Sequence, residues 1–268
     1  MHLAIDLGTT NSVVALAQEG SVRALSLSGF CREQPLVMPA LVPTAVFVRE
    51  TRRRTWPRFW RTEQDALIGQ AALYRNSDGL SPAFAQSFKR ALHTQPHRPV
   101  AKVAGVDVSA REAAYLFLRE LLTAAKTEAG IKRIDSLTIT APVGYYETYR
   151  AELQQLARRL GVKTLRTLDE PIAAALGYGV NVAREETLLI VDFGGGTLNL
   201  AAMRLGPRAY EDGAAPILAK HMVGIGGDDV DKWLLEELLY DFTDLPEWQW
   251  DAHWAVMQAK ADASRTGS

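Results

Sequence analysis

The stretch Leu189–Met203, LIVDFGGGTLNLAAM, is the part of the chain that decides how the rest is interpreted. Apolar residues lead into Asp192, three glycines and Thr197 follow, and an apolar alternation then resumes. Apolar runs on both sides of a short glycine-rich segment predict a β-hairpin. Glycines at a hairpin tip let the backbone approach an anion, so that several N–H groups can point at its oxygens. The stretch therefore predicts a hairpin, and on its own it leaves two explanations of the glycines open, a structural tight turn and a phosphate-binding tip.

A second hairpin of the same kind is predicted near the N-terminus. In AIDLGTTNSVVAL, residues 4–16, Asp6 ends a strand, Gly8, Thr9 and Thr10 form the turn, and a second strand follows. An Asp at the end of a strand can hold a hydrated Mg²⁺ through water, because Mg²⁺ keeps most of its waters. Two such tips facing each other would enclose the phosphates of a nucleotide. The sequence has no G-x-x-x-x-G-K-S/T motif, which excludes a P-loop. A strand and not a helix follows each glycine run, which excludes a Rossmann fingerprint.

The composition is that of an ordinary globular protein. The 268 residues suggest one large or two ordinary domains, and a net charge of −1 gives no reason to expect nucleic acid or a membrane as the main partner. The single Cys31 cannot form an internal disulfide, which fits a reducing cytoplasm. We see no secretory signal and no apolar run of about 18 residues, and we expect a cytoplasmic protein.

The rest of the chain predicts alternating strands and helices. A helix over 81–94 is expected to begin at Ser81 and Pro82, and a long helix after Ser109 to end at Gly130. The basic residues 49–64, with Trp56 and Trp60, are better explained as a solvated loop than as a nucleic-acid patch. Strands and helices then follow in the same order after residue 188, which indicates two related α/β halves.

Five motifs together carry a family resemblance. They are AIDLGTTNSVVAL (4–16), TITAPVGYYETYR (138–150), LDEPIAAALGYG (168–179), VDFGGGTLNLA (191–201) and VGIGGDDVDKWL (223–234). In this order they resemble the nucleotide-binding domain of the seventy-kilodalton heat-shock chaperones, in the actin and sugar-kinase superfamily. The resemblance implies an α/β, ribonuclease-H-like fold in each of two lobes. Lobe I would be 1–180, with a peripheral part over about 32–105, and lobe II 181–268. Lobe II would be incomplete, as in an N-terminal piece of a longer protein.

The resemblance also implies an ATPase, with ATP or ADP, Mg²⁺ and, as a further candidate, K⁺. Asp6 and Asp192 would hold the metal through water. Catalytic roles fall on Lys89, Glu170, Asp192 and Thr197. Nucleotide contacts fall on Gly8, Thr9, Thr10, Asn11, Gly194, Gly195, Gly196, Thr197, Gly226, Gly227, Lys260 and Ser264. A lysine suits this chemistry because phosphoryl transfer needs positive charge on the phosphate oxygens. Without the resemblance, Lys89 would be explained as a solvated helix residue, and Glu170 as a carboxylate favoured at a helix start.

Further implied features concern partners. A C-terminal domain would bind client polypeptides, and a J-domain co-chaperone and a nucleotide-exchange factor would act on the ATPase, with no nucleic acid and no membrane involved. Pro142 and Arg150 match residues that relay nucleotide state to that domain. Met257 stands where the family usually has an acid that contacts the ribose.

Two departures from the family pattern bear on activity. Asn199 replaces an Asp two residues after Thr197, so we expect binding to survive and hydrolysis to slow. The segment between Lys89 and Ser109 is shorter than in typical members, which predicts a reduced peripheral part. Two alternatives stay open: a nucleotide sensor or scaffold with weak or no hydrolysis, and an actin-like polymerising protein, against which IDLGTTNS argues.

Overall fold

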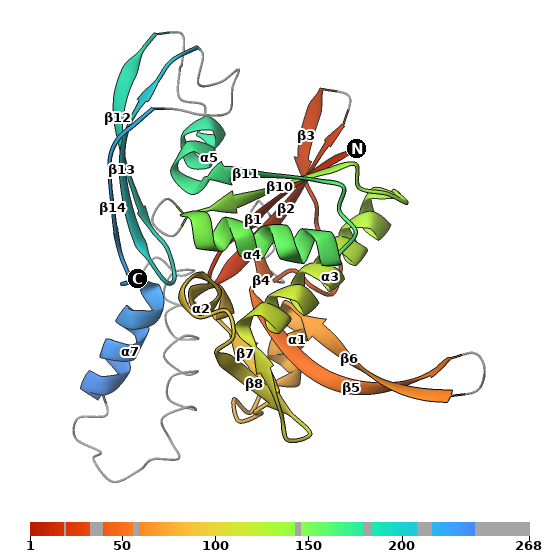
Figure 1. Cartoon of the computed structure of the whole chain (residues 1–268). Coiled ribbons are helices and arrows are strands. Elements are labelled where there is room, and N and C mark those ends of the chain that lie inside the picture. The colour runs from red at the N-terminus through yellow and green to blue at the C-terminus, as the bar shows by residue number, and fades with distance from the viewer. Residues whose placement is uncertain are drawn as a thin grey trace.

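The computed structural model describes residues 1–18, 20–32, 40–55, 59–142, 146–178, 184–207 and 216–238. It shows a mixed α/β architecture in which a central sheet and a second sheet stand side by side, with helix α5 (Glu170–Gly177) between them (Figure 1). A third group of strands and helices lies below the central sheet in this view. The α/β class predicted from the sequence is confirmed.

The central sheet contains the first predicted hairpin. Its strands run in the order β11-β10-β1-β2-β3, and the short β4 also pairs with β2. Strand β1 is antiparallel to β2 and parallel to β10, which is itself parallel to β11. This mixed order agrees with the ribonuclease-H-like lobe that the resemblance implies. The bounds are β1 His2–Leu7, β2 Asn11–Gln18, β3 Ser21–Ala24, β4 Val42–Pro43, β10 Ser136–Ala141 and β11 Thr164–Asp169.

Helices α3 (Ala110–Ala129) and α4 (Tyr146–Arg159) complete the main core. Alternate β1 residues Leu3, Ile5 and Leu7 are at most 1% exposed, as the period-2 pattern of a half-buried strand requires. Helix α3 begins where the sequence predicts, since Ser109 Oγ accepts a hydrogen bond from the Glu112 N–H at 3.2 Å. It ends at Gly130, whose φ of 65° suits a residue without a Cβ.

The peripheral part holds a three-stranded sheet, a two-stranded hairpin and two short helices. The sheet order is β6-β5-β7, and β8 pairs with β9. The bounds are β5 Ala45–Thr55, β6 Phe59–Ile68, β7 Phe84–Gln86, β8 Pro99–Val103, β9 Val106–Ser109, α1 Gln70–Arg75 and α2 Phe88–Thr94.

Two local predictions in this part are wrong. Residues 49–55 and 59–64, expected as a loop, belong to the paired strands β5 and β6, which extend outward from their buried ends, and Arg49 pairs with Asp65 at 2.8 Å; Trp56 lies outside the described residues. The helix expected from Ser81 starts only at Phe88. Residues 84–86 instead form β7 and pair with β5, which buries Ala85 and Val46. Pairing with an existing sheet edge here outweighs local helix propensity.

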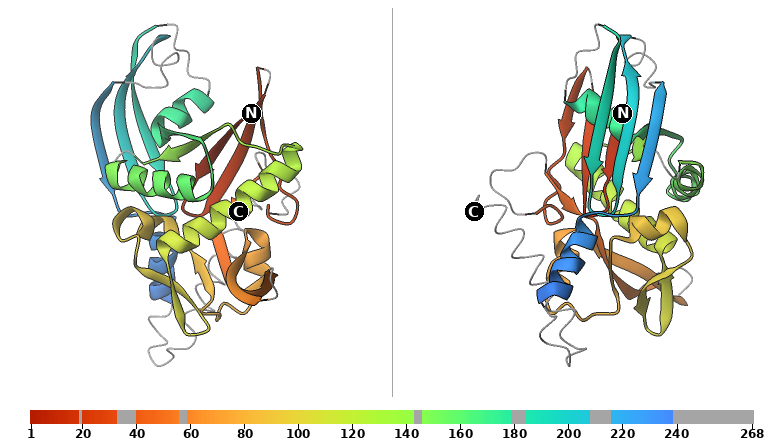
Figure 2. Two further views of the ribbon diagram at one scale, coloured as in Figure 1. Left: turned by 45° about the vertical axis from the view of Figure 1, so that its right-hand side comes forward. Right: turned by 90° about the vertical axis from the view of Figure 1, so that its left-hand side faces the viewer.

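The second sheet contains the opening stretch of the sequence. It has the order β12-β13-β14, with bounds β12 Glu186–Phe193, β13 Leu198–Leu205 and β14 Ile217–Val223, and α7 (Gly227–Leu238) follows it. Its inner face packs on α5, where Ile172 and Ala175 join Ala201, Met203 and Leu205 in a small core (Figure 2). On the outer face Leu189, Val191 and Phe193 are 70%, 61% and 56% exposed.

None of the helices in the described ranges combines the length and the apolar character that crossing a bilayer would need.

Candidate functional site

The tips of the two predicted hairpins lie against each other. Thr9 and Thr10, in the β1–β2 turn, contact Gly195 and Gly196, in the β12–β13 turn. A Cβ added to Gly196 would lie 3.0 Å from Thr9 Oγ1, and one on Gly195 would collide with Thr10 Oγ1. A side chain at Gly195 would therefore require Thr10 to move, and one at Gly196 would press on Thr9, so the absence of a Cβ suits both positions. Two segments more than 180 residues apart in sequence meet here, as the sequence analysis expects of paired phosphate loops.

A third glycine-rich segment, Gly224–Gly227, contacts the tip of the second hairpin. We call the two hairpin tips and this segment the glycine cradle. The Gly227 N–H donates to Gly194 O at 2.9 Å, and the Asp228 N–H donates to Gly195 O at 2.8 Å. Gly226 is buried, and a Cβ there would strike the Gly195 carbonyl. The loop before α7 is thus fixed to the tip of the second hairpin by backbone hydrogen bonds.

Lys89 and Glu170 form a buried ion pair. Lys89 Nζ donates to Glu170 Oε1 at 2.5 Å, and the two side chains are only 5% and 13% exposed. The alternative of a solvated helix lysine is therefore wrong. Burial raises the pKa of Glu170, the Lys89 ammonium opposes that rise, and the carboxylates of Asp6 and Asp192 add to it. A carboxylate with a raised pKa in a fixed position is suited to accept a proton.

The two candidate metal-binding aspartates have different neighbours. Asp6 Oδ1 accepts a hydrogen bond from Thr140 Oγ1 at 2.7 Å. Asp192 is paired across the hairpin with Asn199. Both carboxylates are close enough to Glu170 to raise its pKa. Within the described ranges no three His, Cys, Asp or Glu side chains come close enough to hold a metal ion directly.

The surroundings of Asn199 show whether a hydrated cation fits beside Asp192. Its side chain is 2% exposed, and its Nδ2 donates to Thr197 Oγ1 at 3.2 Å. Its Oδ1 is buried and has no hydrogen-bond partner among the residues that the structure describes. Buried acceptors are nearly always satisfied in folded proteins, so an additional donor is expected beside Asp192. A hydrated cation supplies such a donor through its waters, and the residues present therefore fit one.

A buried aromatic residue, which the sequence analysis did not single out, supports the lysine. The Tyr149 ring on α4 is fully buried, 4.3 Å from the His93 ring in an edge-on contact, and Lys89 Nζ lies 5.9 Å from its centroid. Burial, with the charges of Glu170 and Asp6, raises the pKa of Tyr149 well above its ordinary value. The i, i+4 spacing of Lys89 and His93 on α2 is the only sequence signal of this cluster.

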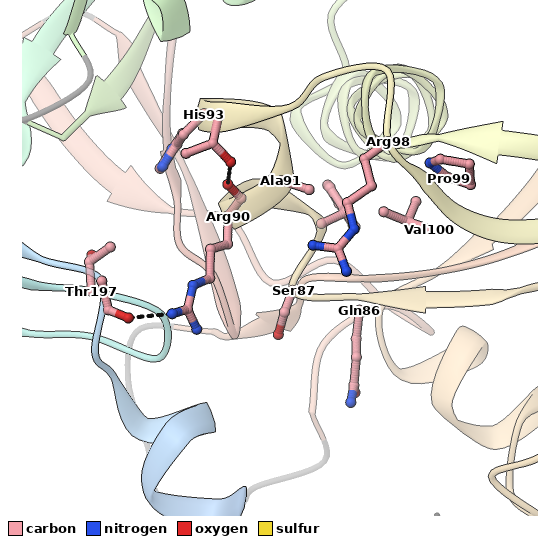
Figure 3. Close-up of a pocket in the computed structure, with 12 residues that line it drawn as sticks. Gln86, Ser87, Arg90, Ala91, His93, Arg98, Pro99, Val100 and Thr197 are labelled. Carbon is pink, nitrogen blue, oxygen red and sulfur yellow. Dashed lines mark hydrogen bonds between the residues drawn. The ribbon is translucent and has the colours of Figure 1, made fainter.

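A pocket of about 510 Å³ adjoins the second hairpin tip. Helix α2 and strand β8 line one side, and Thr197 and Gly224 line the other. In Figure 3 the Arg90 side chain extends from α2 toward the hairpin that carries Thr197, and Ser87 and Arg98 face the same space. Arg90 bonds Asp229 and the Gly224 carbonyl, beyond β14, and the sequence pattern did not identify it.

The remaining predicted residues are only partly placed near this site. The Asn11 side chain accepts a hydrogen bond from Arg32 Nε at 3.0 Å. Pro142 directly follows β10, and Arg150 lies on α4, where burial lowers its pKa and Asp169 opposes that shift. Met257, Lys260 and Ser264 lie outside the described residues.

Known proteins with similar sequences support the family resemblance. Residues 62–261 match the family described as Hsp70 protein. The chain is 26% identical over 260 residues to the chaperone protein dnaK of Gracilaria tenuistipitata var. liui, covering 89% of this chain and 38% of that protein. It is 29% identical over 248 residues to the chaperone protein DnaK of Deinococcus radiodurans, with 89% and 37% covered.

A further relative is the chaperone protein HscA of Proteus mirabilis, 28% identical over 237 residues, with 87% of this chain and 36% of that protein covered. The chain thus spans less than two fifths of the length of these curated relatives. The family match covers most of the chain, and its glycine loops meet as the family resemblance led us to expect. The chain belongs to the Hsp70 family.

Proposed function

We propose that this chain binds Mg²⁺-ATP between two lobes, residues 1–180 and 181–268, and hydrolyses it as the nucleotide-binding module of an Hsp70-type chaperone. The observation that carries the proposal is the contact of Thr9 and Thr10 with Gly195 and Gly196, beside the Lys89–Glu170 pair. Glycine amides and threonine hydroxyls together offer the donors that phosphate oxygens need.

Each residue has a distinct task in this proposal. Mg²⁺, held through water by Asp6 and Asp192, would supply positive charge to the phosphates. Lys89 would turn from Glu170 toward the γ-phosphate, which releases the Glu170 carboxylate. Glu170 would then orient the attacking water and take up its proton, a role that its raised pKa favours. Thr197 would donate from its hydroxyl on the opposite side.

Partners enter the proposal through the relatives, whose names describe them as chaperone proteins. Client polypeptides would be bound by a further domain, and a J-domain co-chaperone and a nucleotide-exchange factor would control turnover. K⁺ beside Mg²⁺, and the relay by Pro142 and Arg150, are part of the same proposal.

A second function is favoured by one observation. Asn199 cannot accept a proton, and it occupies the buried position opposite Asp192. In this alternative the chain senses ATP without turning it over. Because positioning and electrostatics supply most of the catalysis in phosphoryl transfer, we favour slow hydrolysis over none.

The decisive experiment compares two glycine variants by calorimetry with Mg²⁺-ATP. Gly195→Ala places a methyl group against Thr10, whereas Gly177→Ala, the matched control, places one in open space at the exposed end of α5. We expect the parent chain and Gly177→Ala to bind ATP alike and Gly195→Ala to bind at least about tenfold more weakly, a loss of about 1.4 kcal/mol. Equal binding by all three, or none by the parent, contradicts the proposal.

Single-turnover hydrolysis by the parent chain then separates the two functions. Phosphate release that Lys89→Ala abolishes supports the ATPase, and ATP binding without any release selects the sensor.

A further inference from the structure

Helix α2 carries Lys89 and also reaches the second lobe through the next residue. Arg90 Nη1 donates to both carboxylate oxygens of Asp229, at 3.1 and 3.0 Å, and Arg90 Nη2 donates to the Gly224 carbonyl. Because the guanidinium is planar, bonds from one of its nitrogens to a carboxylate and from the other to a carbonyl hold it in orientation as well as in place. Arg90 therefore fixes α2 to the first turn of α7 and to Gly224, just before it.

A second bond joins the same two elements. Ser87 Oγ donates to Asp228 Oδ2 at 2.5 Å. Ser87 stands at the start of α2 with a φ of 52°, a left-handed conformation that is uncommon for serine. We call Ser87, Arg90, Asp228 and Asp229 the interlobe clasp.

The clasp continues into the glycine loop. Asp229 Oδ2 also accepts from the Gly226 N–H at 2.9 Å. Gly226 touches the Gly195 carbonyl at the tip of the second hairpin. One carboxylate thus connects Arg90 with the glycine cradle, so that α2 and the cradle cannot shift independently while it is bound.

We propose that Arg90 and Asp229 are positioning residues, which fix Lys89 relative to the second-lobe glycine loop and withdraw it when the lobes separate. The catalytic part of this inference rests on the proposed ATPase function. The side chains of Arg90 and Asp229 are 41% and 23% exposed, and ion pairs of this kind add little to global stability. The clasp should therefore affect local geometry and nucleotide kinetics more than unfolding.

The first test needs no nucleotide. Hydrogen exchange on the 268-residue chain is compared for the parent, Arg90→Ala, Arg90→Lys and Arg98→Ala. Arg98 is the matched control, because it lines the same pocket, while its side chain has no hydrogen bond or ion pair in the described part of the chain. We expect roughly three- to tenfold faster exchange of the amides at 226–230 in Arg90→Ala, partial rescue in Arg90→Lys, and parent behaviour in Arg98→Ala.

The second test adds a fluorescent ATP analogue with Mg²⁺. In Arg90→Ala we expect three- to tenfold faster nucleotide dissociation and a lower single-turnover rate at saturating ATP, with Arg98→Ala unchanged. If the parent binds no ATP but the exchange result holds, the proposed function fails and the clasp stands. If Arg90→Ala matches Arg98→Ala in exchange, the clasp is overturned whatever the nucleotide does.

Discussion

The same sequence pattern has opposite surroundings in the two hairpins. Leu3, Ile5 and Leu7 flank Asp6 in β1 and are at most 1% exposed. Leu189, Val191 and Phe193 flank Asp192 in β12 in the same way and are 56–70% exposed. Helices α3 and α4 cover the first set, and in the described ranges no element covers the second. An apolar period-2 pattern therefore shows which residues share a face of the sheet, and packing elsewhere in the chain determines whether that face is buried.

The largest expected effect follows directly from this comparison. Ile5→Ala leaves a cavity in the main core and should lower the free energy of unfolding by about 2 to 5 kcal/mol. Val191→Ala, its counterpart, should change it by no more than about 0.5 kcal/mol, since the side chain is already in solvent. Chemical denaturation followed by circular dichroism measures both. Equal losses would show that the β12 face is covered in solution.

A smaller loss of stability is expected when Asn199, which lies opposite Asp192, is replaced by aspartate. Asn199→Asp places a second carboxylate opposite Asp192 in a buried position and should cost about 1 to 3 kcal/mol without metal. Mg²⁺ should recover part of this loss, and with Mg²⁺-ATP the single-turnover rate should rise. Melting temperatures with and without Mg²⁺ measure the first effect.

The control for this variant is Asn76→Asp, another buried amide, whose Oδ1 already accepts a hydrogen bond from the Ser81 N–H. It should lose stability with no response to Mg²⁺. An identical Mg²⁺ response in both variants, or an unchanged rate in Asn199→Asp, would refute the assignment of Asn199 to the metal side of the site.

Acid should lower the stability of the folded chain through His93. Burial, with the nearby Lys89 charge, lowers the pKa of His93 to about 3 from 6.5. Between these values the unfolded chain binds a proton that the folded chain does not, so stability falls as pH decreases from 6.5 toward 3, by at most about 1.4 kcal/mol per unit. His93→Phe should flatten this slope, and His221→Gln, at an exposed position on β14, should not. Parallel slopes for all three proteins would contradict the assignment.

The sequence was a good guide where local chemistry and tertiary structure agree. The β1–β2 and β12–β13 hairpins and the α3 helix with its Ser109 cap follow from alternation, glycines and capping residues that act within a few positions. The errors at Ser81–Gln86 and at residues 49–64 have another cause. Residues 84–86 pair with the distant strand β5, a partner that a single sequence does not show. Strands β5 and β6 pair with each other as a hairpin, which the run of arginines in that segment did not indicate.

The candidate site was predictable to a similar degree. Two matching hairpins with glycine and threonine at their tips indicate phosphate chemistry together, so the contact between the two tips could be expected. The ion pair of Lys89 with Glu170 joins residues 81 positions apart, and the bonds of Arg90 join residues 139 positions apart. Only the acidic pair Asp228–Asp229 at the start of α7 hints at a cationic partner, and helix-terminus electrostatics explains that pair equally well.

Helix α5 connects the Lys89–Glu170 ion pair with the core of the second sheet. Its first residue is Glu170, which pairs with Lys89, and two and five residues later Ile172 and Ala175 pack into the inner face of the second sheet. One short helix therefore ties the position of the Glu170 carboxylate to the packing of β12–β14, and a change in that packing is expected to reach the ion pair without any direct contact between the two.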